Sequence, residues 1–147
     1  MNTEYLNARA NTLLDSMERE PFGHLCIQGP QGSGKMSLLT LTNTLYGKRH
    51  TQRAGIIVVT LEASFDSKNL VGTYVCSESG DFVFKKGPLT VAAEQGLWLV
   101  LRNIEECPSD LLSFMLPLIQ DNKLQVTSSL QIRPKLGFRL CFLQKTS

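Results

Sequence analysis

One glycine-rich segment constrains the fold of this chain more than any other part of its sequence: residues 29–35, Gly-Pro-Gln-Gly-Ser-Gly-Lys. It satisfies the pattern G-x-x-x-x-G-K, and its surroundings are those that the pattern needs. A short apolar stretch at residues 24–28 comes directly before it, and leucines at helical spacing follow it over residues 35–46. The sequence therefore predicts a buried strand, a tight glycine turn and a helix, in that order.

The rest of the chain alternates between apolar runs and helical patterns. Continuous apolar runs, typical of buried strands in a parallel sheet, occur at residues 55–61, 97–101 and 138–143. Helices are expected over residues 3–17, 66–70, 87–95 and 109–120, an extended piece over 82–85, and a hairpin over 123–132. Gly47 is expected to cap the helix that begins at Lys35, and Pro117 to kink or shorten the last helix. This alternation predicts a three-layer α/β domain with a mainly parallel sheet.

Composition fits one domain and excludes several classes of function. The chain has 147 residues, 42% of them hydrophobic, which is enough for a single core. Its 15 basic and 13 acidic residues are spread along the chain, so we expect no direct nucleic-acid binding. No apolar run approaches the roughly 20 residues that cross a bilayer, and the N-terminus lacks the apolar centre of a signal peptide. We therefore expect no membrane association.

The cysteines lie far apart and are not spaced as zinc ligands: Cys26, Cys76, Cys107 and Cys141. A core of this size needs no covalent cross-link, which favours reduced cysteines and an intracellular location. A disulfide framework is the weaker alternative.

The glycine-rich segment predicts phosphate binding. Its glycines let successive backbone N–H groups point at phosphate oxygens, and the following helix adds the positive end of its dipole. Lys35 would pair with the β and γ phosphates of ATP or ADP. The candidate nucleotide-binding residues are Gly29, Pro30, Gln31, Gly32, Ser33, Gly34, Lys35, Met36 and Ser37. The alternative is a glycine turn beside a solvated lysine, with no ligand.

Magnesium, by contrast, lacks ligands at the positions where this motif provides them. The residue after the lysine is normally Ser or Thr, but here it is Met36, whose thioether is a poor ligand for a hard cation. Ser37 comes one residue late, about 100° further around the helix. Where P-loop ATPases place an Asp after a buried strand, this chain has Arg102 and Asn103. Arg102 would put a fixed positive charge in the place of the metal, from which it could also pair with a phosphate.

Two acidic residues follow shortly after, and they leave one alternative open. Glu105 and Glu106 could act as displaced catalytic acids, although they lie several Å along the chain from the usual position. The competing interpretation is that they are solvated at the start of the next helix.

Several stretches of the chain resemble the midasin family of dynein-related AAA+ proteins. The most specific is the Asp-Ser-Lys-x-Leu-x-Gly-x-Tyr element at residues 66–74, which is most similar to the first AAA+ module of that family. The others are residues 82–84, 87–90, 96–101, 104–108, 110–112, 116–120 and 138–140. The resemblance covers most of the chain from about Pro21 onward.

This resemblance implies parallel strands in the order 5-1-4-3-2, a small helical lid, and nucleotide held between neighbouring modules of a ring. We expect a leading helix in residues 1–20 and an AAA+ core in residues 21–147 that lacks the fifth strand and the lid. The strand at residues 24–28 would then be an exposed edge, and the protein marginally stable or self-associating. The implied partners are neighbouring AAA+ modules and a pre-ribosomal particle, in the nucleolus or nucleoplasm.

At the positions that the family uses for ATP hydrolysis, this chain has residues that are unsuited to that reaction. The family's acidic pair falls on Arg102 and Asn103, its polar sensor near Lys145, and its magnesium-binding hydroxyl on Met36. The resemblance therefore implies a degenerate module that binds nucleotide, weakly or not at all, without Mg²⁺ or hydrolysis. Two alternatives stay open: an active ATPase that uses Glu105 or Glu106 with Ser37, and an interaction domain that binds no nucleotide.

Overall fold

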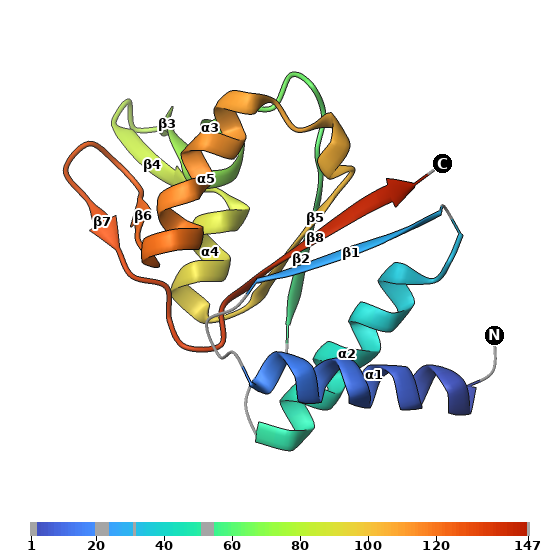
Figure 1. The fold of residues 1–147 in the computed structure, drawn as a ribbon. Coiled ribbons are helices and arrows are strands. Elements are labelled where there is room, and N and C mark those ends of the chain that lie inside the picture. Colours follow the sequence, from blue (N-terminus) through green and yellow to red (C-terminus); the bar gives the residue numbers. More distant parts are fainter. Residues whose placement is uncertain (1–2, 20–23, 31, 51–54, 147) are drawn as a thin grey trace.

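The computed structural model describes residues 3–19, 24–30, 32–50 and 55–146, and it is built around a parallel sheet (Figure 1). The strands lie in the order β1 (Leu25–Pro30), β8 (Arg139–Thr146), β5 (Trp98–Arg102) and β2 (Ile56–Thr60). All three pairings are parallel. The predicted α/β class is therefore confirmed, and the family order 1-4-3-2 is confirmed for these four strands. Within the described residues no fifth strand joins this sheet, and β1 lies at its edge.

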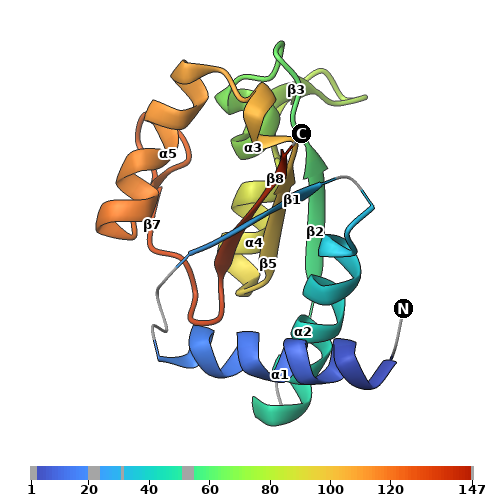
Figure 2. The same cartoon turned by 45° about the vertical axis from the view of Figure 1, so that its right-hand side comes forward.

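Helices cover both faces of the sheet, which makes the domain three-layered (Figure 2). One face carries α1 (Thr3–Glu18) and α2 (Lys35–His50). The other carries α3 (Ser67–Val71), α4 (Pro88–Gln95) and α5 (Ser109–Asp121). Two antiparallel hairpins complete the fold, β3 (Gly72–Cys76) with β4 (Phe82–Lys86) and β6 (Leu124–Gln125) with β7 (Gln131–Ile132). Among the described residues, no helix combines the length and apolar character that crossing a membrane requires.

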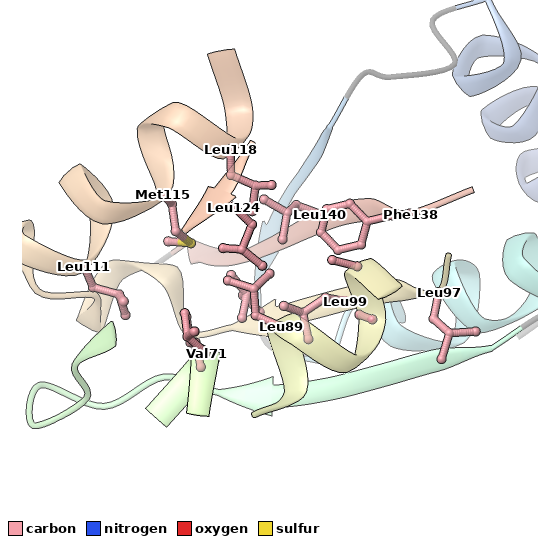
Figure 3. Packing of buried hydrophobic residues seen from close by; sticks show 14 of the residues in the cluster. Val71, Leu89, Leu97, Leu99, Leu111, Met115, Leu118, Leu124, Phe138 and Leu140 are labelled. Carbon is pink, nitrogen blue, oxygen red and sulfur yellow. The ribbon is translucent and has the colours of Figure 1, made fainter. Parts of the chain in front are cut away.

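Strand β5 joins the two cores because its side chains alternate between the faces of the sheet. Leu99 and Leu101 pack with α4 and α5, as Figure 3 shows for Leu99. Trp98 and Val100 pack on the opposite side, against α1 and α2. All four side chains are buried, so the prediction of a strand covered on both faces is confirmed here.

The prediction of a buried strand is wrong for β1, an edge strand whose residues alternate between partly exposed and exposed, Cys26 among the latter. It is also wrong for β2. Among the described strands, β2 lies at the edge of the sheet and pairs with β5 alone, and its side chains are only partly covered. Val58, in the middle of the strand, is 43% exposed. A continuous β-branched run therefore occurs here in an edge strand rather than a central one.

Two predicted helix ends are also wrong, the cap at Gly47 and the shortening at Pro117. Gly47 does not cap α2 but lies buried inside it, and the helix continues to His50. Its last turn is held to α1 by an ion pair, with Arg49 2.6 Å from Asp15, and by a hydrogen bond between His50 and Glu18 at 2.6 Å. Helix α5 likewise runs past Pro117 to Asp121, because its buried face of Leu111, Met115 and Leu118 is packed into the core.

The domain boundary expected after residue 20 lies outside the described residues. The hairpin predicted over residues 123–132 is confirmed as β6 and β7. Of the other hairpin, sequence patterns predicted β4 but not its partner β3.

His24 lies just before β1 and connects it to β8. Its Nδ1 accepts a hydrogen bond from the backbone N–H of Leu140 at 3.0 Å, and its ring meets Phe138 edge-on. Burial lowers the pKa of His24 below its ordinary value of 6.5, and the positive charge of Arg139 lowers it further. The neutral imidazole is therefore the form that the folded protein prefers.

Acidification is expected to destabilise the protein through His24. Because its pKa is lower in the folded state, the unfolded chain binds a proton first, so stability is lost as the pH falls below about 6.5. His24→Asn, whose amide oxygen can accept the same hydrogen bond, should show a smaller loss between about pH 7.5 and pH 5.5 by chemical denaturation. An unchanged pH slope in His24→Asn would contradict this assignment.

The central strand should also be intolerant of truncation. Leu99 is fully buried, so Leu99→Ala leaves a cavity and should lower the free energy of unfolding by about 2 to 5 kcal/mol. Leu112 on α5 is 44% exposed, and Leu112→Ala should change stability by less than about 0.5 kcal/mol. Denaturant titration of both variants measures the difference, and equal effects would place Leu99 outside the core.

Candidate nucleotide-binding site

The glycine-rich segment forms the predicted turn between a strand and a helix. Strand β1 ends at Pro30 and α2 begins at Lys35. Gly32 and Gly34 both have φ of 84°, a left-handed conformation that glycine adopts without steric cost. The backbone N–H of Ser33 donates to the carbonyl of Pro30 at 3.2 Å, which tightens the turn. Gln31 lies outside the described residues.

The turn places the positive end of α2 and the Lys35 ammonium next to each other. Helix α2 has 16 residues and no acidic residue in its first turn, so its positive dipole end is not neutralised there. The Lys35 ammonium donates to the carbonyls of Gly29 at 2.6 Å and Pro30 at 3.0 Å. It therefore lies against the loop itself, where charged phosphate oxygens would be stronger acceptors than these carbonyls.

A cleft of about 440 Å³ opens beside this loop, a size typical of small-molecule sites. It is lined by Gly32, Ser33, Gly34, Lys35, Met36, Ser37, Arg102, Asn103, Leu143 and Lys145. The structure thus brings together the described residues of the loop from Gly32 onward with Arg102, Asn103 and Lys145, while Gly29 and Pro30 form the end of β1. Leu143 was not predicted from the sequence.

The parallel sheet explains why residues so far apart in sequence meet here. The carboxyl ends of β1, β5 and β8 lie at one edge of the sheet, where ligands bind in open α/β folds. In the strand register, Lys145 is opposite Gly29 and Leu143 is opposite Arg102. The pairing itself therefore sets the distance of both cations from the loop.

The lining of the cleft is cationic. Lys35, Arg102 and Lys145 contribute three positive charges, and no Asp or Glu is among the described lining residues. Within the part of the chain that the structure describes, the side chains of Arg102 and Lys145 make no ion pair. Such a cleft attracts anions.

The same residues do not fit Mg²⁺. Met36, in the first turn of α2, lines the cleft and also packs against the core, and the hydroxyl-bearing Ser37 lines the cleft despite its predicted displacement around the helix. The oxygen donors that line the cleft are neutral side chains, those of Ser33, Ser37 and Asn103, and a hard divalent cation prefers carboxylates. The described residues contain no cluster of three or more His, Cys, Asp or Glu side chains that could hold a metal.

Glu105 and Glu106 lie close to this region but do not line the cleft. Both are exposed in the short 3-10 helix η1 (Ile104–Glu106), between β5 and α5. A carboxylate oxygen of Glu105 accepts from the backbone N–H of Lys145 at 3.5 Å. Glu105 therefore borders the end of β8.

A second hollow of about 240 Å³ lies on the other side of the loop and was not predicted. Helix α1 contributes Tyr5, Leu6 and Arg9 to it, and the loop contributes Ser33, Gly34 and Lys35. The Arg9 guanidinium lies over the Tyr5 ring, 5.8 Å from its centroid. The helix that precedes the strand therefore forms part of the surroundings of the loop.

This chain is similar to a known protein family and to known proteins. A family model, AAA domain (dynein-related subfamily), matches residues 24–143. Midasin from Dictyostelium discoideum is 31% identical over 118 residues, which are 79% of this chain and 2% of that relative. Midasin from Giardia intestinalis is 31% identical over 113 residues, 76% of this chain and 2% of that relative. The chain therefore spans only a small part of the length of these relatives.

Solved structures share the fold. NtrX from Brucella abortus superposes with a TM-score of 0.65 and 19% identity, covering 93% of this chain and 30% of that one. Its complex with ADP gives 0.62 and 16%, covering 100% of this chain and 31% of that one. At these identities the likeness concerns the fold alone. Because the family model extends from His24 to Leu143, through all four parallel strands, this chain belongs to the AAA domains of the dynein-related subfamily.

Proposed function

We propose that this chain is a degenerate AAA+ module that binds ATP or ADP through its glycine-rich loop and does not hydrolyse it. The observation that carries the proposal is the composition of the cleft. Its phosphate-binding part keeps the glycines, Lys35 and the free end of α2. The positions for metal and water activation hold Met36, Arg102, Asn103 and Lys145, none of which can supply a carboxylate.

The expected loss of transition-state stabilisation is large enough to support the absence of hydrolysis. Removal of one group that stabilises transition-state charge costs about 2.7 to 4 kcal/mol of barrier. Since each 1.36 kcal/mol is tenfold in rate, the loss of two such groups slows the reaction by about 10⁴-fold or more. This chain lacks both the metal ligands and the acid that activates water, so its turnover should approach the background rate.

A module of this kind would serve assembly rather than turnover. We propose that it is one member of a midasin-like ring, where it contacts neighbouring AAA+ modules. The support is its resemblance to two midasins at 31% identity. A part in the maturation of the large ribosomal subunit, in the nucleolus or nucleoplasm, is proposed on the same resemblance.

Lys35→Ala tests nucleotide binding. Loss of its charged hydrogen bonds to phosphate should weaken binding of a fluorescent ADP analogue by about tenfold or more. Lys48→Ala, which removes an exposed lysine from the last turn of the same helix, is the matched control and should bind like the unmodified protein. No binding by either protein would favour the interaction domain without nucleotide, and equal binding by both would place the nucleotide away from Lys35.

Glu105→Gln tests the competing function, an active ATPase. The observation in its favour is that Glu105 reaches the end of β8 at the edge of the sheet where Ser37 lines the cleft. We expect Mg²⁺-ATP turnover near background, with no change on Glu105→Gln, in a phosphate-release assay. Glu78→Gln, at an exposed turn between β3 and β4, is the control. Turnover that Lys35→Ala and Glu105→Gln abolish and Glu78→Gln retains would establish the ATPase instead.

A further inference from the structure

We infer that the cleft binds its polyphosphate free of divalent metal, and that Arg102 and Lys145 supply the positive charge that Mg²⁺ supplies in hydrolytic P-loop sites. This inference rests on the nucleotide binding proposed above and names the ionic form of the ligand. It also gives Arg102 and Lys145 a role in a module that does not hydrolyse ATP.

The strand geometry directs both side chains to the face that carries the loop and α2. Along β5, Trp98 and Val100 pack on the α2 side of the sheet, and Arg102 follows at the same two-residue period. Along β8, Cys141 and Leu143 pack on that side, and Lys145 follows in the same way. Both side chains are accordingly among the lining residues of the cleft, together with Lys35.

Their positions in the sheet place them next to the loop and next to each other. Lys145 pairs with Gly29, the first residue of the glycine-rich segment. Arg102 pairs with Leu143, two residues before Lys145 on the same strand. The two cations therefore come from neighbouring strands at the edge of the sheet that the phosphate loop closes.

No carboxylate among the described residues neutralises these charges within the cleft. Glu105 contacts Lys145, but its carboxylate accepts from the backbone N–H of that residue. Like charges that share a cleft repel each other, and a bound anion removes that repulsion. A nucleoside polyphosphate, which carries three or four negative charges when free of metal, has the charge that this cleft lacks.

Mg²⁺ bound to the phosphates would weaken the attraction between the cationic cleft and the nucleotide. The metal would neutralise two of the ligand's charges and would lie among Lys35, Arg102 and Lys145 without an acidic ligand. The guanidinium of Arg102 instead offers a planar fork of donors that matches two phosphate oxygens, and the Lys145 ammonium offers a compact charge beside it. The metal-free nucleotide is therefore the better ligand.

The experiment compares nucleotide binding by the whole chain with and without Mg²⁺. Calorimetric titrations with ADP and with ATP are run in EDTA and in excess MgCl₂ at the same ionic strength. We expect binding in EDTA and an apparent affinity about tenfold or more weaker when Mg²⁺ complexes nearly all the nucleotide. This comparison needs no variant, so it does not depend on how well a substituted protein folds.

Variants then assign the effect to the two residues. Arg102→Ala and Lys145→Ala should each weaken binding in EDTA by about tenfold, since each removes charged hydrogen bonds to phosphate. Arg133→Ala, an exposed arginine directly after β7, is the matched control and should leave the affinity unchanged. The double variant Met36→Thr with Arg102→Asp restores a hydroxyl and a carboxylate at the metal positions, and Mg²⁺ should now tighten ATP binding.

The outcomes separate this inference from the function on which it rests. If Mg²⁺ tightens nucleotide binding to the unmodified protein, or if Arg102→Ala and Lys145→Ala bind as it does, the inference is wrong while nucleotide binding stands. If neither nucleotide binds in either buffer, the proposed function fails, and the inference fails with it.

Discussion

The parallel pairing of β8 with β1 on one side and β5 on the other is the constraint on which the rest of the structure depends. It joins the last described strand to the first, and it fixes Lys145 opposite Gly29 and Leu143 opposite Arg102. A shift of one residue in either register would turn every following side chain to the other face of the sheet. The sheet therefore assembles the candidate site from three parts: the glycine-rich loop after β1, the end of β5 and the end of β8.

The same alternation of side chains ties stability to the site. Trp98 and Val100 on β5 hold the layer of α1 and α2 against the sheet, while Leu99 and Leu101 hold the opposite layer. Since α2 begins directly after the loop, the packing of Leu39 and Met36 on this core aims the positive end of the helix at the cleft. Met36, which is unsuited to bind a metal, thus contributes to the position of the phosphate-binding loop.

Features encoded locally could be predicted from the sequence, and features set by distant contacts could not. The strand, the glycine turn and the helix around Lys35 follow from adjacent residues, as does the position of Arg102 at the end of a buried strand. By contrast, the exposure of Val58 depends on which strand lies at the sheet edge, which an apolar run does not reveal. The last turn of α2, beyond Gly47, contacts α1 through the ion pairs of Arg49 with Asp15 and Glu18, which are far from it in sequence. Ser37 lines the cleft together with Met36, which also packs against the core.

Replacement of the acids in this cleft changes its ligand preference as well as its chemistry. Neutral residues at the same positions would remove metal binding and leave phosphate recognition to the loop alone. Here Arg102 stands at one of the acidic positions and Lys145 near the polar sensor position, and both cations extend from strand ends toward the face where the loop lies. In the proposed function, the electrostatic role of the metal passes to two cationic side chains, neither of which can act as a general base toward an attacking water molecule. Phosphate binding and phosphate hydrolysis have separate requirements, and this cleft retains the groups needed for the first.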